Sequence, residues 1–243
     1  MKRITVLSFL AALYVFALEI SGCKSNTTTK IVSGSGILYK QITIKEKNKF
    51  GEIKVQYPVF PRCPDLNNAV KAAVVSPFRS FRSTMKQDWE EMDRIRRETG
   101  PEGITPPFSY DVGCNPVILT DRYISLLFTT YTMEGGAHGD TTVCSFTYDR
   151  KLNRQVSITE TTGYTLDEIA AYCNDYFTKN LNFSDGSRES EDECTKWIAE
   201  GTAPEKKNYE KFTYDGKTLT VYFEPYIVAP YVYGIQKVEI PAK

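Results

Sequence analysis

The sequence predicts an α+β fold, in which antiparallel sheets are packed by a long N-terminal helix and a second, C-terminal helix. Alternating apolar residues indicate strands in several parts of the chain, and two stretches repeat apolar residues at three- and four-residue steps. The connections between the predicted strands are short. Short connections favour antiparallel pairing, because parallel strands need long crossovers.

The strands are expected where apolar and polar residues alternate between turn residues. Residues 37–60 indicate two strands joined by a polar turn, and Asp215-Gly216 between two alternating runs is typical of a tight hairpin. Further strands are expected at 108–112, 118–133 with a turn near Asp121, 141–148, 212–214, 218–223 and 235–240.

Two helices are expected from capping residues and apolar stripes. The first begins at Pro64, which is tolerated in a first turn, and its stripe continues to Met92. Pro77 lies inside this stripe, so a kink or a break is expected there. The second begins at Thr165, whose spacing to Glu168 is typical of a capping box.

The N-terminus predicts export and a lipid anchor. Lys2 and Arg3 precede an uncharged apolar run over 4–18, which is too short for a comfortable membrane span. Ile20-Ser21-Gly22-Cys23 follows and resembles a bacterial lipobox, which implies lipidation of Cys23. An ordinary secretory signal is the alternative. The protein is therefore expected in the cell envelope, extracytoplasmic and lipid-anchored to a membrane whose leaflet is left open.

This assignment divides the chain into four parts. Residues 1–22 form a lipoprotein signal peptide, and the polar residues 23–36 are expected to form a flexible tether. Residues 37–160 and 161–243 form the N-terminal and C-terminal α+β halves of one globular unit.

The charge and histidine counts exclude several classes of function. The chain has 30 basic and 30 acidic residues, so it lacks the basic excess of a nucleic-acid-binding protein. Its single histidine excludes metal motifs that need two histidines. No cofactor, metal site or catalytic set is therefore expected.

Five cysteines remain once Cys23 is assigned to the lipid. Exported chains meet an oxidising compartment, so at least one disulfide is expected. Cys173 and Cys194 are the predicted pair, because both lie in one helix-rich stretch. The pairing among Cys63, Cys114 and Cys144 is left open.

The first candidate site is the segment Glu134-Gly135-Gly136-Ala137-His138-Gly139-Asp140. The functional interpretation makes His138 a general base that Asp140 or Glu134 orients. The structural interpretation, which we favour, is a tight loop whose glycines need positive φ and whose imidazole forms a stabilising hydrogen bond. No nucleophile elbow of the GxSxG type accompanies it.

The second candidate site is the tyrosine-rich segment 223–234 near the C-terminus, where aromatic residues and prolines alternate. Exposed tyrosines there can stack on sugar rings or anchor a protein partner. The alternative is a corner whose rings cover the core. The candidate aromatic surface consists of Tyr222, Tyr226, Tyr231 and Tyr233.

Both segments resemble a bacterial extracytoplasmic domain of unknown function. The similarity is carried by Gly135-Gly136-Ala137-His138, Thr165-Leu166-Asp167-Glu168, Tyr222-Phe223-Glu224-Pro225-Tyr226, Ala229-Pro230-Tyr231, Gly234 and Val238-Glu239-Ile240-Pro241. That domain forms the outer part of the lysozyme-sensing anti-sigma-V factor and is fused to some peptidoglycan and polysaccharide deacetylases. The resemblance implies an α+β fold and a binding or sensing role without catalysis, since the deacetylase chemistry belongs to a separate metal-dependent domain.

Three functions are therefore carried forward. The favoured one is a membrane-anchored, non-catalytic module that binds a cell-envelope glycan, such as peptidoglycan, or an envelope protein. The second is an envelope hydrolase that uses His138 with Asp140 or Glu134. The third is a structural lipoprotein of an envelope assembly.

Overall fold

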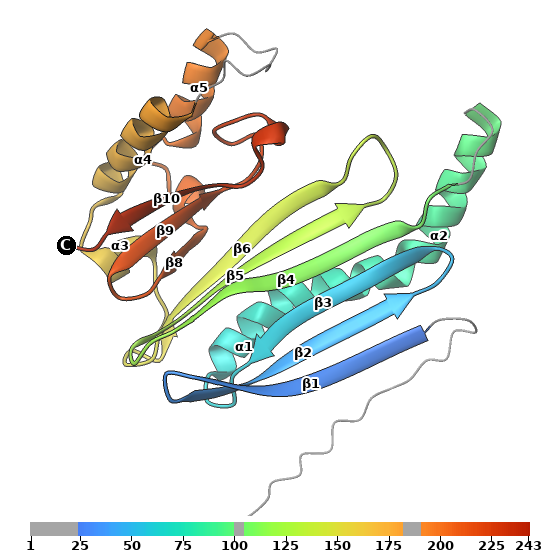
Figure 1. Ribbon diagram of the computed structural model, residues 1–243, viewed down its shortest axis with the longest axis horizontal. Helices are drawn as coiled ribbons and strands as arrows, with labels where there is room; N and C mark the ends of the chain where they lie inside the picture. Colours follow the sequence, from blue (N-terminus) through green and yellow to red (C-terminus); the bar gives the residue numbers. More distant parts are fainter. Residues whose placement is uncertain (1–23, 100–104, 182–190) are drawn as a thin grey trace, which may run out of the picture.

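The computed structural model describes residues 24–99, 105–181 and 191–243, and within them the fold is α+β, as predicted (Figure 1). The strands described there form a seven-stranded sheet in the order β1 to β7 and a three-stranded sheet in the order β10-β9-β8. The strands are β1 Lys24–Gly34, β2 Ile37–Lys47, β3 Gly51–Val59, β4 Phe108–Leu119, β5 Tyr123–Met133, β6 Asp140–Asp149, β7 Arg154–Gln155, β8 Phe212–Tyr214, β9 Thr218–Phe223 and β10 Gln236–Pro241.

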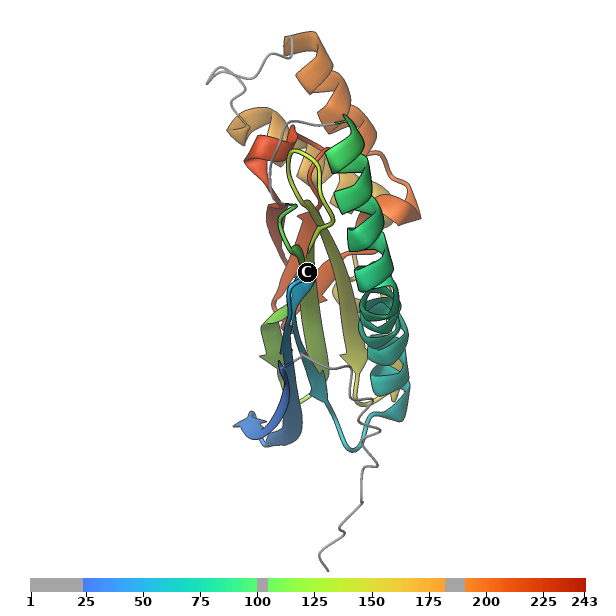
Figure 2. The ribbon, with the colours of Figure 1, turned by 90° about the vertical axis from the view of Figure 1, so that its right-hand side faces the viewer.

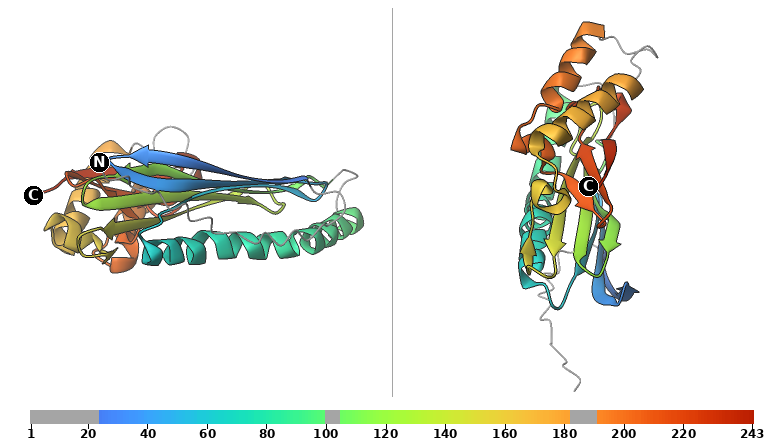
Figure 3. Two further views of the ribbon diagram at one scale, coloured as in Figure 1. Left: turned by 90° about the horizontal axis from the view of Figure 1, so that it is seen from below. Right: turned by 90° about the vertical axis from the view of Figure 1, so that its left-hand side faces the viewer.

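Helices cover one face of the large sheet and one side of the small sheet (Figure 3). The helices are α1 Pro64–Val70, the π-helical turn η1 Lys71–Val75, α2 Ser76–Thr99, α3 Ile158–Thr162, α4 Leu166–Asn180, α5 Glu191–Gly201 and the 3₁₀ turns η2 Lys206–Tyr209 and η3 Tyr231–Tyr233. In the described part of the chain, no helix is both long and apolar enough to cross a membrane.

Antiparallel pairing holds for every described strand pair except β3 and β4, which are parallel. The exception follows from the connection between them, because α1, η1 and α2 return along the sheet before β4 begins. Pro77 does not end this helical run. The π turn η1 ends two residues before Pro77. Its wider backbone avoids the steric clash between a proline ring and the preceding turn of a regular α-helix.

The first part of strand β5, from Tyr123 to Phe128, is buried on both faces and contributes to two cores. Leu126 and Phe128 pack with the apolar side of α1 and α2, whereas Tyr123 packs with the core beneath the small sheet. The ring of Tyr123 lies 5.0 Å from the ring of Tyr214 in β8. Burial of both faces explains why the sequence of this strand does not alternate cleanly.

Serine hydroxyls of the large sheet bind the edge of the small sheet. Ser125 in β5 accepts the backbone N–H of Tyr214 at 3.0 Å, and its Oγ lies 2.7 Å from the hydroxyl of Thr147 in β6. Ser145 in β6 accepts the N–H of Phe212 at 2.8 Å. These bonds satisfy β8 donors at an edge that would otherwise be buried without partners.

The prediction of a flexible tether is wrong for Lys24–Gly34. These residues form β1, which pairs with β2 along its whole length. A polar, threonine-rich segment suits an edge strand, because threonine favours extended backbone and the side chains remain in solvent. Cys23 and the predicted signal peptide lie outside the described residues, and the boundary expected at residue 160 stays a prediction.

The capping box that begins the second predicted helix is confirmed. The hydroxyl of Thr165 accepts the N–H of Glu168 at 3.2 Å, and the Glu168 carboxylate accepts the N–H of Thr165 at 2.8 Å. The Asp215-Gly216 hairpin is confirmed as well, with Gly216 at a φ of +94° between β8 and β9.

The predicted disulfide between Cys173 and Cys194 is not formed. Both cysteines are buried as thiols. Next to Cys173, Asn174 of α4 donates to Thr202, the residue that follows α5, at 2.9 Å.

The serine bonds between the sheets give the first prediction. Ser125→Ala leaves the N–H of Tyr214 and the hydroxyl of Thr147 buried without this partner, so the free energy of unfolding should fall by about 1–3 kcal/mol. Ser83→Ala, at an exposed position of α2, should change it by less than about 0.5 kcal/mol. Urea denaturation measures both, and equal stabilities for the two variants would contradict this role of the serine.

Candidate binding site

The two segments singled out in the sequence lie side by side in the structure (Figure 1). His138 belongs to the loop between β5 and β6, and Tyr231 belongs to the segment between β9 and β10. Their rings stack with centroids 4.4 Å apart and planes 26° apart. The Tyr231 hydroxyl donates to the carbonyl of Gly139 at 2.8 Å, so the contact is fixed by a hydrogen bond as well as by stacking.

Two further rings extend this contact into a row. Tyr226 lies 5.7 Å from Tyr231 with planes 33° apart, and Trp197 lies 6.3 Å from Tyr226 with planes 78° apart. We call His138, Tyr231, Tyr226 and Trp197 the aromatic ladder. Its members come from three segments that are far apart in the sequence: the β5–β6 loop, α5 and the β9–β10 segment.

The aromatic ladder is accessible to solvent. His138 and Tyr226 are exposed, the latter by 54%, while Tyr231 and Trp197 are half-buried. Val232, in the adjacent turn η3, is 82% exposed. Rings and an apolar side chain that remain in solvent on a folded domain are typical of a surface that binds another molecule.

The prediction that Tyr222 belongs to an exposed aromatic surface is wrong. Tyr222 is buried between the sheets with Leu127 and Val143, and its hydroxyl lies 3.0 Å from that of Thr213. The reason is strand parity, since alternate residues of β9 face the large sheet. Tyr233 is half-buried in η3. Trp197 was not predicted as part of the site, because its contact with Tyr226 joins residues far apart in the sequence.

Glu224 fixes the start of the β9–β10 segment. Its carboxylate accepts the N–H of Val143 in β6 at 2.6 Å and pairs with Lys211. The only carboxylate of the tyrosine-rich segment is thus occupied in joining the small sheet to the large one. This pairing makes it a structural group rather than a reacting one.

The backbone of Tyr226 adopts a conformation that side chains rarely take. Its φ is +69°, and its N–H donates to the carbonyl of Ala229 at 2.9 Å within a tight turn. A left-handed tyrosine costs free energy that the surrounding structure must supply, and such residues cluster at binding and active sites. The turn holds this ring outward, at the middle of the aromatic ladder.

Gly201 allows α5 to approach the turn that carries Tyr226. A Cβ atom at Gly201 would lie 2.2 Å from the carbonyl oxygen of Ile227 and 2.7 Å from the side chain of Val228. Gly139 is similar, since a Cβ there would lie 2.4 Å from the ring of Tyr131. Both glycines permit contacts that bring segments of the site together.

The loop around His138 follows the structural interpretation of the sequence. Gly135 and Gly136 have φ values of +99° and +90°, as expected for a tight glycine turn. The Nδ1 atom of His138 lies 2.9 Å from the carbonyl oxygen of Gly139. Because a carbonyl only accepts, this contact requires the proton on Nδ1.

No carboxylate orients His138 in the described part of the chain. Glu134 and Asp140 are exposed, and neither forms a hydrogen bond or ion pair with the imidazole among these residues. A general base normally has such a partner. The arrangement needed for the hydrolase alternative is therefore not assembled by the geometry.

Cys144 and Cys173 are poor nucleophiles. Burial raises the pKa of Cys144 to about 11, with a further contribution from Glu224, and burial raises the pKa of Cys173 to about 12. Thiols with such values stay protonated at neutral pH, and only the thiolate attacks or binds metal. The residues that the structure describes contain no cluster of three or more His, Cys, Asp or Glu suited to a metal ion.

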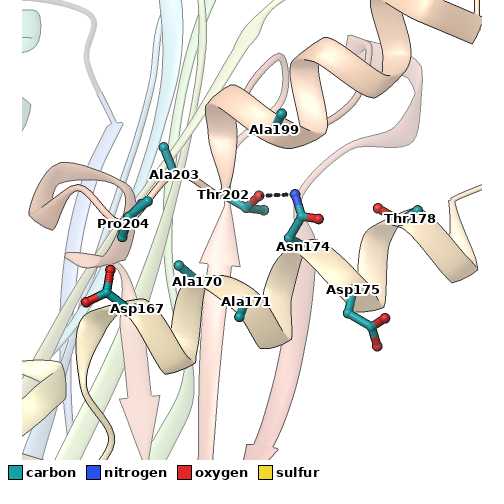
Figure 4. Close-up of a pocket in the computed structure, with 10 residues that line it drawn as sticks. All are labelled: Asp167, Ala170, Ala171, Asn174, Asp175, Thr178, Ala199, Thr202, Ala203 and Pro204. Carbon is teal, nitrogen blue, oxygen red and sulfur yellow. Dashed lines mark hydrogen bonds between the residues drawn. The ribbon is translucent and has the colours of Figure 1, made fainter.

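A shallow groove of about 470 Å³ separates α4 from α5 (Figure 4). The hydrogen bond between Asn174 and Thr202 crosses it, and Asp175 points away from its floor into solvent. Its lining shares no residue with the aromatic ladder and holds no acid–base pair. The lining residues are Asp167, Ala170, Ala171, Asn174, Asp175, Thr178, Ala199, Thr202, Ala203 and Pro204.

Comparison with known protein families finds two matches. Residues 160–243 match the family described as "Protein of unknown function (DUF3298)", and residues 44–141 match the family described as "Deacetylase PdaC". These matches confirm the resemblance, inferred from the sequence, to a domain of unknown function that accompanies peptidoglycan deacetylases. The aromatic ladder has members in both matched segments. His138 lies within residues 44–141, and Trp197, Tyr226 and Tyr231 lie within residues 160–243.

Comparison with individual proteins agrees. The peptidoglycan-N-acetylmuramic acid deacetylase PdaC of Bacillus subtilis (strain 168) is 26% identical over 201 residues, which cover 82% of this chain but 39% of that protein. DUF3298 family proteins from Pseudomonas aeruginosa PAO1 and Bacteroides fragilis NCTC 9343 share the fold with TM-scores of 0.54 and 0.51. Each is 15% identical, with 90% of this chain and 89% of the other covered.

The close approach at Gly201 gives the second prediction. Alanine normally stabilises a helix relative to glycine, but Gly201→Ala should lower the free energy of unfolding by about 1–3 kcal/mol because its Cβ meets the backbone of Ile227. Gly113→Ala is the matched control, since a Cβ there meets nothing within 4 Å. Urea denaturation compares them, and a Gly201→Ala chain as stable as the parent would show that the segments are not in close contact.

Proposed function

We propose that this chain, with its segments related to DUF3298 and to PdaC, is an extracytoplasmic module that binds a cell-envelope glycan and catalyses no reaction. The observation that carries the proposal is the aromatic ladder, a solvent-accessible row of rings held in place by hydrogen bonds and backbone contacts. The centres of neighbouring rings lie 4.4 to 6.3 Å apart, and the exposed sides of the rings offer apolar surface to a ligand.

The chemistry of the aromatic ladder suits a polysaccharide. A sugar ring presents an apolar face of C–H groups and a polar rim of hydroxyls, and aromatic side chains have the same combination of apolar faces and, in tyrosine and tryptophan, a polar group. Successive rings suit successive sugars of a linear chain. The net charge of zero agrees with recognition by shape and hydrogen bonding rather than by bulk charge.

The relative named above supports a peptidoglycan ligand. Its name gives peptidoglycan N-acetylmuramic acid as the target of its deacetylase activity. Because this chain spans only 39% of that protein, we propose shared recognition of the glycan and not shared chemistry. Binding without catalysis is supported by His138, which is engaged in stacking, and by Glu224, which is engaged in a structural ion pair.

The proposal includes anchoring through a lipid on Cys23. The lipobox-like sequence up to Cys23 and the apolar run before it support export and lipidation. The protein would then act in the cell envelope, on the outer side of the membrane that holds its lipid.

Replacement of one ring tests glycan binding. Tyr226→Ala removes the most exposed tyrosine of the aromatic ladder, so the affinity of the full chain for purified peptidoglycan should fall by about tenfold. Tyr172→Ala is the matched control, because this tyrosine of α4 is 43% exposed and lies outside the ladder. Co-sedimentation with insoluble peptidoglycan gives the affinities. Equal retention of both variants, or no retention of the parent chain, would refute the proposal.

Replacement of Cys23 tests the anchor. The parent chain should fractionate with membranes and release glycerol-linked fatty acids on hydrolysis, whereas Cys23→Ser should carry no lipid. Mass spectrometry of the N-terminal peptide measures the modification directly. An unmodified Cys23 in exported protein would exclude lipidation and leave glycan binding to be judged by the experiment above.

A further inference from the structure

We propose that the end of the large sheet at which β1 begins contacts the membrane and binds anionic lipid headgroups. We call this region the sheet-end surface; it consists of Lys45, Lys47, Lys49, Phe50, Lys86 and Trp89. The inference rests on the proposed lipidation of Cys23 and adds to it a second, electrostatic contact with the bilayer.

The start of β1 leaves no room for a spacer. The strand begins at Lys24, the residue that follows Cys23 in the sequence, and it pairs with β2 over eleven residues. One residue spans at most about 3.6 Å, so a lipid on Cys23 holds the first residue of β1 at the level of the headgroups. The sheet must therefore meet the membrane with this end.

The strand register identifies what else lies at this end. Lys24 pairs with Lys47, which pairs with Glu52, so the turn between β2 and β3 lies beside the start of β1. Figure 2 views the molecule from this side. The same turn packs on α2, because the ring of Phe50 lies 5.6 Å from that of Trp89.

Cationic side chains gather around this turn. Lys47 pairs with Glu52 at 2.6 Å, and Lys86 pairs with Glu90 at 3.8 Å. Lys45 and Lys49 have no acidic partner among the described residues, and both are exposed. Their charges are thus available to the phosphates of an anionic bilayer.

An aromatic pair completes the sheet-end surface. The ammonium groups of Lys49 and Lys86 lie 4.7 and 5.9 Å from the centre of the Phe50 ring. Trp89 is half-buried, and its indole N–H donates to the carbonyl of Pro106 at 3.0 Å. Tryptophan and lysine side chains are the groups that proteins place at the boundary between headgroups and acyl chains.

The chain contains two tryptophans, Trp89 in the sheet-end surface and Trp197 in the aromatic ladder, and each serves as a control for the other. Trp197→Phe leaves Trp89 as the only reporter, and Trp89→Phe leaves Trp197. The β5–β6 loop of the ladder lies at the same end of the sheet, where Gly135 approaches Met92 of α2. Trp197 is three ring contacts from His138 along the ladder, so it should report weaker contact with the headgroups than Trp89.

The test uses the full lipidated chain in phosphatidylglycerol vesicles whose headgroups carry a spin label. Trp89 should lose most of its fluorescence, and Trp197 should lose little. Equal quenching of the two would overturn the proposal. A chain that binds the vesicles through its lipid but leaves Trp89 unquenched would overturn it while leaving anchoring intact, whereas a chain that does not bind at all would overturn both.

Lysine variants separate electrostatic contact from mere proximity. Lys45→Gln with Lys49→Gln should weaken the headgroup contact by about fivefold for each lysine and reduce the quenching of Trp89. Lys151→Gln with Lys206→Gln is the matched control, since both lysines are exposed and lie away from this turn. In phosphatidylcholine vesicles, which lack anionic headgroups, Trp89 of the parent chain should be quenched as little as in the Lys45→Gln, Lys49→Gln variant. Undiminished quenching under either change would overturn the role of anionic headgroups.

Discussion

The hydrogen bonds that join the edge of the small sheet to serines of the large sheet determine how the two sheets meet. Ser125 and Ser145 satisfy backbone donors of β8, and Glu224, which follows β9, adds a bond to Val143 of β6. Polar groups buried in this way are specific, because a shift by one residue would leave donors without acceptors. The relative position of the two sheets is thus fixed by directional bonds as well as by apolar packing.

The candidate binding site depends on that position. No single segment contains the aromatic ladder, and the stacking of His138 on Tyr231 exists only because the β5–β6 loop and the β9–β10 segment meet across the sheets. Gly201 and the left-handed Tyr226 then set how closely α5 approaches. The surface is preorganised by the fold, which reduces the entropy that a ligand must overcome on binding.

Features with local causes were predictable from the sequence. The fold class, the capping box at Thr165 and the turn at Gly216 each follow from the residues that form them. The strand β1 was missed because its polarity suits a tether and an exposed edge strand equally well. The burial of Tyr222 and the entry of Trp197 into the aromatic ladder depend on strand parity and on long-range packing, which one sequence without a structure does not supply.

The burial of both faces of β5 has a consequence for cooperativity. One set of its side chains belongs to the core under α1 and α2, and the other set belongs to the core under the small sheet. Loss of either core would expose one face of Tyr123–Phe128, the part of the strand that is buried on both faces. We therefore expect the segments that match two separate families to unfold together, as one cooperative unit rather than as two modules joined in series.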